Sequence, residues 1–158
     1  MKKILKTGGD FTPCPVATGD ELFPNGIFVF NITKLLEYIH NNRYSVPLEE
    51  VAVKDFCKDY SVINESYVDS VEISDPVVMA EISPGRYNLI DGHHRMEKAR
   101  RLGIYSIPAY KLSVEQHVRF LTSEKAYVAF VEYWNSKLKE RTETNRRFKK
   151  NRKSMRSS

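Results

Sequence analysis

Hydrophobic residues recur along the chain at two different spacings, and each spacing predicts a different kind of element. The apolar run from Ile27 to Phe30 predicts a short strand, and Asn31 directly after it is a residue type that caps helices well. Apolar residues then recur with a period near 3.6 at positions 32, 35, 36 and 39. We therefore expect a strand followed directly by a helix that ends near residues 41 and 42.

The middle of the chain is predicted to be a succession of short elements. Residues 51–53 predict a strand, residues 55–60 a polar turn or short helix, and residues 65–71 a helix. Two further strands are expected at 77–82 and 87–90, and the Ser-Pro-Gly-Arg sequence between them is typical of a turn. These two strands therefore predict a hairpin.

After this hairpin the pattern changes from strand to helix within two residues. A helix is expected over residues 92–102, with Gly103 as its stop signal, and a strand over residues 104–112. Ser113 and Gln116 form a capping-box pattern, which predicts the start of another helix.

The two ends of the chain give weaker patterns. Residues 7–26 contain four of the seven glycines and three of the seven prolines, so regular structure there must be short. Residues 124–141 carry an aromatic-rich stripe at helical spacing, which we interpret as a face packed into the core. Apolar side chains nearly vanish beyond Thr142, and we expect residues 142–158 to form a disordered basic tail.

These elements predict an α/β (α+β) protein with a small mixed sheet flanked by helices. A chain of 158 residues with 41% hydrophobic residues can close one core and at most a small satellite, which excludes a multidomain protein. We expect an N-terminal extension packed on the core (1–46), a central domain (47–112), C-terminal helices that complete the core (113–141) and the basic tail (142–158).

The formal net charge of +5 is unevenly distributed along the chain. Residues 137–158 hold ten Lys or Arg and two Glu, a net charge of +8, whereas residues 1–136 carry a net charge of −3. A basic tail of this kind favours contact with the phosphates of DNA or RNA, although it could also serve only to keep the chain in solution. The candidate nucleic-acid contacts are Arg146, Arg147, Lys149, Lys150, Arg152 and Lys153.

Cysteine usage and the N-terminus predict the compartment. Cys14 and Cys57 are 43 positions apart, a spacing that fits a reducing environment better than a disulfide framework. The first residues show no apolar stretch of signal-peptide length, and no run approaches the roughly 18 apolar residues of a membrane helix. We therefore expect a cytoplasmic protein without a membrane partner.

The sequence Asp91-Gly92-His93-His94-Arg95 combines features that together point to an anion site. Asp91 can cap the following helix, Gly92 allows a sharp turn, and three side chains able to carry positive charge occupy the first helical turn. A helix N-terminus already bears about half a positive charge, so each cation there costs roughly 0.3 to 1 kcal/mol. A bound phosphate or carboxylate would make the same three side chains favourable, because free amides and cations would converge on it.

Each of these residues also has a purely structural explanation. Asp91 alone can be a cap, either histidine can be a neutral residue packed against the adjoining strand, and Arg95 can pair with Glu81 or another carboxylate. We predict no metal site, because adjacent helical residues point about 100° apart and neither flanking thiols nor a second carboxylate have ligand spacing.

The stretch of residues 86–110, which contains the sequence DGHHRMEKARRLG at 91–103, resembles the signature turn and helix of the ParB/sulfiredoxin superfamily. The resemblance extends from about residue 47 to 112 and implies a ParB/sulfiredoxin-like fold for this domain. It also implies that the turn holds the phosphates of ATP, ADP or CTP, with Gly92 as the turn glycine and His94 and Arg95 as the phosphate-contacting pair. His93 replaces the sulfiredoxin catalytic cysteine, and the partition-protein Gly-Glu-Arg-Arg turn is absent.

Three classes of function follow from these observations. The first is a nucleotide-binding domain that acts as a phosphotransferase or hydrolase, with Mg²⁺ as the usual partner of the nucleotide and Asp91, Asp55 or Glu50 as candidate general bases. The second is a DNA-associated module, either a nucleotide-gated binder or a nuclease, that uses the basic tail. The third is a structural or regulatory protein that keeps the fold with an inactive site. The sequence does not indicate the oligomeric state.

Overall fold

The computed structural model describes residues 4–5, 11–26, 28–56 and 63–156. Six strands are described: β1 (Leu22–Asn25), β2 (Phe28–Asn31), β3 (Leu48–Ala52), β4 (Val77–Ser83), β5 (Arg86–Asp91) and β6 (Ser106–Leu112). The α-helices are α1 (Ile32–Asn41), α2 (Glu65–Val68), α3 (His93–Arg101), α4 (Val114–His117) and α5 (Glu124–Arg156), with short 3-10 helices η1 (Arg43–Ser45), η2 (Val53–Asp55) and η3 (Val118–Phe120).

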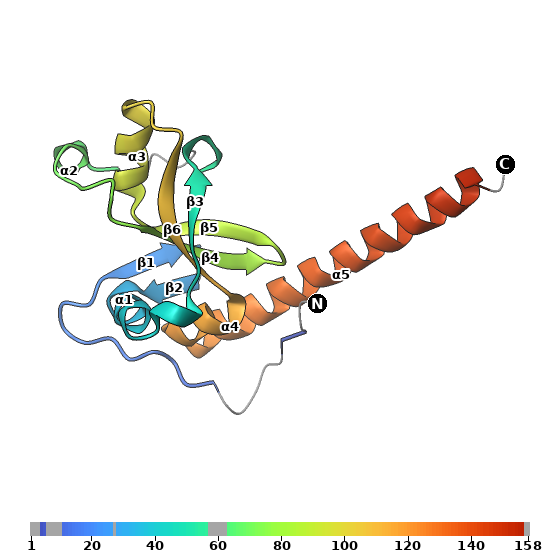
Figure 1. Cartoon of the computed structure of the whole chain (residues 1–158). Coiled ribbons are helices and arrows are strands. Elements are labelled where there is room, and N and C mark those ends of the chain that lie inside the picture. Colours follow the sequence, from blue (N-terminus) through green and yellow to red (C-terminus); the bar gives the residue numbers. More distant parts are fainter. Residues whose placement is uncertain (1–3, 6–10, 27, 57–62, 157–158) are drawn as a thin grey trace.

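The protein is a mixed α/β structure with two sheets, in agreement with the predicted fold class (Figure 1). The four-stranded sheet has the order β3-β6-β4-β5, in which β4 and β6 run parallel and the other neighbours run antiparallel. β1 and β2 form a separate antiparallel pair. The predicted hairpin is confirmed as β4 and β5, and it places Asp91 opposite Val78.

Strand β4 lies in the middle of the protein and separates two hydrophobic clusters. All seven of its residues are buried, and successive side chains point to opposite faces of the sheet. Val77 and Met79 pack in one cluster with Met96 and Ala99 of α3. Residues 78, 80 and 82 pack in the other cluster with α1, β2 and α5. A strand buried on both faces explains why residues 77–82 are apolar almost without interruption.

Two of the helices begin at the residues that the sequence predicts. The side chain of Asn31 caps α1 by accepting a hydrogen bond from the backbone N–H of Lys34, at 3.1 Å. Ser113 and Gln116 form both bonds of the expected capping box at the start of α4. The predicted strand over residues 104–112 and helix over residues 92–102 are confirmed with small changes at their ends.

The expectation of a disordered tail is wrong for residues 142–156, which continue α5 as helix. In Figure 1 the second half of α5 projects away from the rest of the protein. Phe130 and Trp134 are fully buried and fix the first half of this helix in the core. Extending an existing helix avoids the cost of nucleating one, and residues 135–156 contain neither Gly nor Pro. Helix propagation therefore explains order in a segment that has few apolar residues.

Some expectations differ from the structure or fall outside it. Strand β1 was not among the predicted elements, although it pairs with β2 over four residues. Ile27, Cys57 and residues 57–60 of the expected polar turn lie outside the described residues. No helix in the described part of the chain is both long and apolar enough to span a membrane.

Candidate phosphate-binding turn

Gly92 forms the turn between β5 and α3 and is the only residue type that fits there. Its φ of 99° lies in the left-handed region that L side chains rarely adopt. A Cβ at this position would stand 2.5 Å from Cγ1 of Val77 and 2.9 Å from its Cβ. The turn is therefore packed directly against the first residue of β4, which fixes where α3 begins.

The N-terminus of α3 lacks the usual side-chain cap. Gly92 occupies the N-cap position, so the expectation that Asp91 caps this helix is wrong. No acidic residue lies in the first turn, and the first helical bond runs from the N–H of Met96 to the carbonyl of Gly92 at 3.0 Å. Within the described residues, the backbone N–H groups of His94 and Arg95 donate to no acceptor. Two amide donors and the positive end of the helix dipole are thus available to an anion.

Arg95 is bonded within the protein. Its Nη2 donates to Oδ2 of Asp91 at 3.1 Å, and its Nη1 donates to the carbonyl oxygens of Asp75 and Pro76 at 3.2 and 2.7 Å. The carboxylate of Asp91 therefore balances part of the positive charge that made this helix terminus unusual. Arg95 pairs with a carboxylate, as one of the structural explanations requires, and its partner is Asp91 rather than Glu81.

His94 accepts a hydrogen bond from the main chain. Its Nε2 lies 2.9 Å from the backbone N–H of Asn64, and the ring meets that of Tyr67 edge-on with centroids 5.9 Å apart. Because an N–H donor requires an unprotonated ring nitrogen, the proton of the neutral imidazole lies on Nδ1. The side chain of His94 therefore keeps a donor at Nδ1 while Nε2 fastens the turn to the segment before α2.

His93 lies against the N-terminal part of the chain. Its ring stacks on Phe23 of β1, with centroids 5.0 Å apart and planes 28° from parallel. This contact brings β1 beside the turn although the two residues are 70 positions apart in the sequence. Phe23 of the N-terminal segment therefore lies beside the candidate site, a contact that no pattern in the sequence predicts.

Glu21 is a second site residue that sequence reasoning missed. The pKa of this carboxyl is raised, first by partial desolvation and then by the negative charge of Asp91, while Arg95 acts in the opposite direction. These effects place Glu21 in the electrostatic field of the Asp91 and Arg95 pair. No signal in the sequence links Glu21 to the turn, because the interaction depends on the contact between β1 and β5.

Of the three candidate general bases, only Asp91 lies at the turn. Glu50 is exposed on β3, the opposite edge of the sheet from β5. Asp55 ends η2 and is also exposed. In the described part of the chain, neither forms a hydrogen bond or ion pair with residues 91–95. Proton transfer at this turn would therefore depend on Asp91 or Glu21.

The basic residues proposed to contact nucleic acid lie on the projecting half of α5. Arg146, Arg147, Lys149 and Lys150 are exposed, and the spacing of 146, 149 and 150 puts these three on one helix face. The side chains of Arg152 and Lys153 lie outside the described residues. These residues lie on the half of α5 that projects away from the rest of the protein, whereas the turn lies at the start of α3 (Figure 1). The structure therefore does not bring the basic residues to the turn.

Comparisons with known proteins add no assignment. No protein-family model matches the chain, and no curated protein matches it either. Among the described residues, no group of three or more His, Cys, Asp or Glu side chains is arranged to hold a metal ion.

Proposed function

We propose that the turn at Asp91–Arg95 binds the phosphate groups of a nucleotide. The observation that carries this proposal is the uncapped N-terminus of α3, where the N–H groups of His94 and Arg95 lack acceptors in the described part of the chain. A helix N-terminus of this kind binds phosphate through its amides and its dipole. His94 adds a donor at Nδ1.

The pairing of Arg95 with Asp91 is compatible with this role. Arg95 is held by three acceptors, so its guanidinium is positioned before a ligand arrives. A guanidinium has five N–H donors and can keep its protein partners while it contributes charge to a bound anion. The positive potential at the turn is reduced by Asp91, which favours a ligand that arrives with Mg²⁺ over a bare polyphosphate.

The resemblance of residues 86–110 to the ParB/sulfiredoxin superfamily supports the same ligand class. It implies ATP, ADP or CTP as the nucleotide, and His94 and Arg95 as the residues nearest the phosphates. The proposal from α3 and the proposal from the resemblance rest on different observations, and both lead to the same turn.

A phosphotransferase or hydrolase at this turn would use few residues. Positioning and charge stabilisation supply most of the catalysis of phosphoryl transfer, and a base is needed when the acceptor is a hydroxyl. Asp91, at the end of β5, and Glu21, which interacts electrostatically with Asp91 and Arg95, are the candidate bases. ADP release with Mg²⁺ and a panel of small hydroxyl compounds tests this step. Turnover that is unchanged in Glu21→Gln would exclude Glu21.

Binding is tested by thermal unfolding with ATP, ADP, CTP and GTP, each with and without Mg²⁺. A ligand at 100 times its Kd adds about 2.7 kcal/mol to stability, which raises the Tm by several degrees. We expect His94→Ala to reduce the rise, because it removes one side-chain donor and leaves the amides of α3 in place. His40→Ala is the matched control, since His40 is exposed on α1. If no nucleotide raises the Tm of the unmodified chain, the proposal is wrong.

A second candidate function, binding of nucleic acid through the basic half of α5, is favoured by the continuous helix. Because residues 146–150 are helical, Arg146, Lys149 and Lys150 form a fixed row of charge rather than a flexible tail. Removal of residues 146–158 tests it: binding of DNA or RNA should weaken and become less sensitive to salt. Unchanged affinity would exclude this segment as the contact surface.

A further inference from the structure

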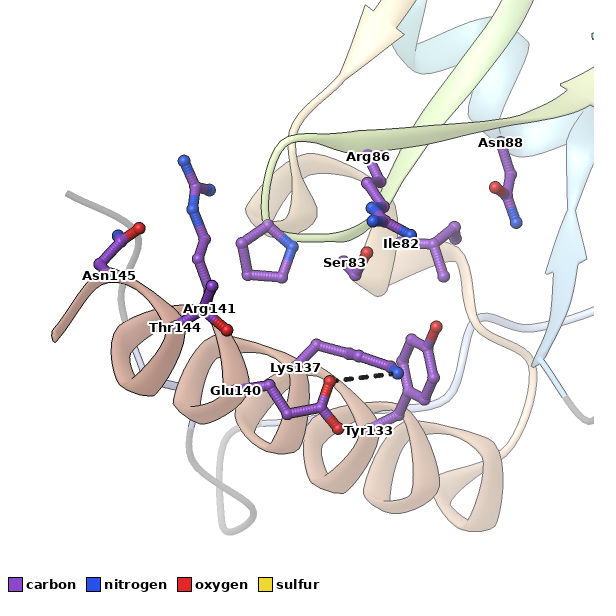
Figure 2. Close-up of a pocket in the computed structure, with 11 residues that line it drawn as sticks. Ile82, Ser83, Arg86, Asn88, Tyr133, Lys137, Glu140, Arg141, Thr144 and Asn145 are labelled. Carbon is purple, nitrogen blue, oxygen red and sulfur yellow. Dashed lines mark hydrogen bonds and ion pairs between the residues drawn. The ribbon is translucent and has the colours of Figure 1, made fainter. Parts of the chain in front are cut away.

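A polar cleft lies between the turn of the β4–β5 hairpin and α5. Its volume is about 610 Å³, within the range of pockets that hold small ligands. Figure 2 shows Arg86 and Asn88 on the hairpin side and Tyr133, Lys137 and Arg141 on the helix side. This cleft contains neither the turn at Gly92 nor the basic segment at residues 146–150.

Two guanidinium groups in the cleft have no partner in the part of the chain that the structure describes. Arg86 and Arg141 form neither a hydrogen bond nor an ion pair there. Nη1 of Arg141 reaches to within 3.4 Å of where a Cβ on Gly85 would stand, so this side chain crosses from α5 to the hairpin turn. The third cation, Lys137, lies 3.4 Å from Glu140, a separation at which exposed ion pairs contribute little.

Three cations around one cleft, balanced by a single carboxylate, favour binding of an anion. Arginine is suited to phosphate because its planar group presents parallel N–H donors to two oxygens. Polar side chains of Ser83, Asn88 and Asn145 line the same cleft and offer further hydrogen bonds. An apolar ligand would have to displace water from these groups without replacing their hydrogen bonds.

The exposed side chains further along α5 favour a ligand with several phosphates in a row over a single anion. Phe148 follows Arg141 by seven residues, which places it on the same face of α5 about 10 Å further along the axis. Its side chain is 61% exposed, and Tyr133 inside the cleft is 38% exposed. A row of cations interleaved with exposed aromatic rings is the arrangement that proteins use to bind single-stranded nucleic acid, with the rings stacking on bases.

We propose that the cleft between the β4–β5 hairpin and α5 binds the backbone of a single-stranded nucleic acid, with Arg86 and Arg141 contacting phosphates. The site is separate from the nucleotide turn, since Arg86 begins β5 and Asp91 ends it. Five residues of extended strand separate the two ends by about 17 Å. The strand then leaves the cleft along α5 toward Phe148 and the basic segment.

Fluorescence anisotropy of the full-length chain with labelled 12-nucleotide DNA and RNA single strands tests this proposal. The variant Arg86→Gln/Arg141→Gln should raise the Kd about a hundredfold, because two charge-assisted contacts are lost. The slope of log K against log salt should fall in magnitude by about 1.4, or 0.7 for each phosphate contact. The control variant Lys125→Gln/Lys139→Gln removes two exposed lysines outside the cleft and should change neither quantity.

Three results would overturn the proposal. The first is an equal loss of affinity in the cleft and control variants, which would mean that net charge alone drives binding. The second is displacement of the oligonucleotide by polyglutamate at matched charge, which would indicate an acidic peptide. The third is tighter binding of a duplex of the same length. His94→Ala should leave oligonucleotide binding unchanged, so failure at the turn and failure at the cleft are told apart.

Discussion

The carboxylate of Asp91 and the guanidinium of Arg95 are joined across the turn between β5 and α3, with 3.1 Å between Oδ2 and Nη2. Arg95 also bonds the carbonyl oxygens of Asp75 and Pro76. One side chain therefore connects the end of β5, the start of α3 and the residues that precede β4. A residue that resembles a phosphate contact in the sequence is also a structural link.

Arg95→Ala should lower the free energy of unfolding by about 2 kcal/mol, because it leaves a half-buried carboxylate and two carbonyls without their donor. Arg43→Ala is the control, since Arg43 is exposed and pairs only with the exposed His40 in the described part of the chain. That variant should change stability by less than about 0.5 kcal/mol. Urea denaturation measures both, and equal values would show that the Arg95 bonds contribute nothing.

Gly92→Ala should destabilise the protein by about 2 to 4 kcal/mol. The positive φ costs a side chain roughly 1 to 2 kcal/mol, and overlap with Val77 adds a comparable amount. In the double variant Gly92→Ala/Val77→Ala, the overlap is reduced but the backbone strain stays, so the two changes should cost less together than their sum. A double-mutant cycle measured in urea gives this coupling. Strict additivity would show that the close approach is absent in solution.

Stability should fall on mild acidification because of His117. Burial lowers the pKa of this ring to about 4, although its bond to the carbonyl of Glu81 acts in the opposite direction. The unfolded chain therefore binds a proton near pH 6.5 that the folded protein does not bind until pH 4, and stability is lost as the pH falls through this window. We expect a loss of about 2 kcal/mol between pH 7 and pH 5.

His117→Gln retains a donor for the carbonyl of Glu81 and removes the titration. Its free energy of unfolding should be lower than that of the unmodified chain at pH 7 but nearly independent of pH between 7 and 5. A pH dependence that is the same in both proteins would exclude His117 as its source.

Removing residues 146–158 should reduce the helical circular dichroism of the chain by the amount expected for 11 helical residues, Arg146–Arg156. The Tm should change little, because residues 146–150 are exposed and contribute no buried side chain. An unchanged signal per molecule would show that this segment is not helical in solution and would support the original expectation from composition.

Local patterns were enough to predict most of the elements of the central domain. The β4–β5 hairpin, α3 and β6 follow from apolar runs broken by Ser-Pro-Gly-Arg, Gly92 and Gly103, which are short-range signals. The helical half of α5 beyond Thr142 could not be predicted, since its order depends on propagation from a buried segment anchored by Trp134. Composition alone predicts disorder for the residues beyond Thr142.

The candidate site was only partly predictable for a related reason. Gly92 and the cationic side chains after it are adjacent in the sequence, so their grouping was visible there. Other contacts at the site join segments that are distant in the chain. Phe23 stacks on His93, and the backbone N–H of Asn64 donates to His94. Glu21 interacts electrostatically with Asp91 and Arg95. The sequence left several carboxylates open as the partner of Arg95, and the turn at Gly92 brings Asp91, four residues earlier, beside it.

The proposed site at the start of α3 is tested most directly by backbone amide NMR of the full-length chain titrated with Mg²⁺–ATP, and with adenosine as the ligand without phosphates. The account predicts that ATP causes its largest amide shifts at His94 and Arg95, the two N–H groups without acceptors in the described residues, while adenosine leaves them in place. Shifts confined to other parts of the protein, or the same response to adenosine, would contradict it.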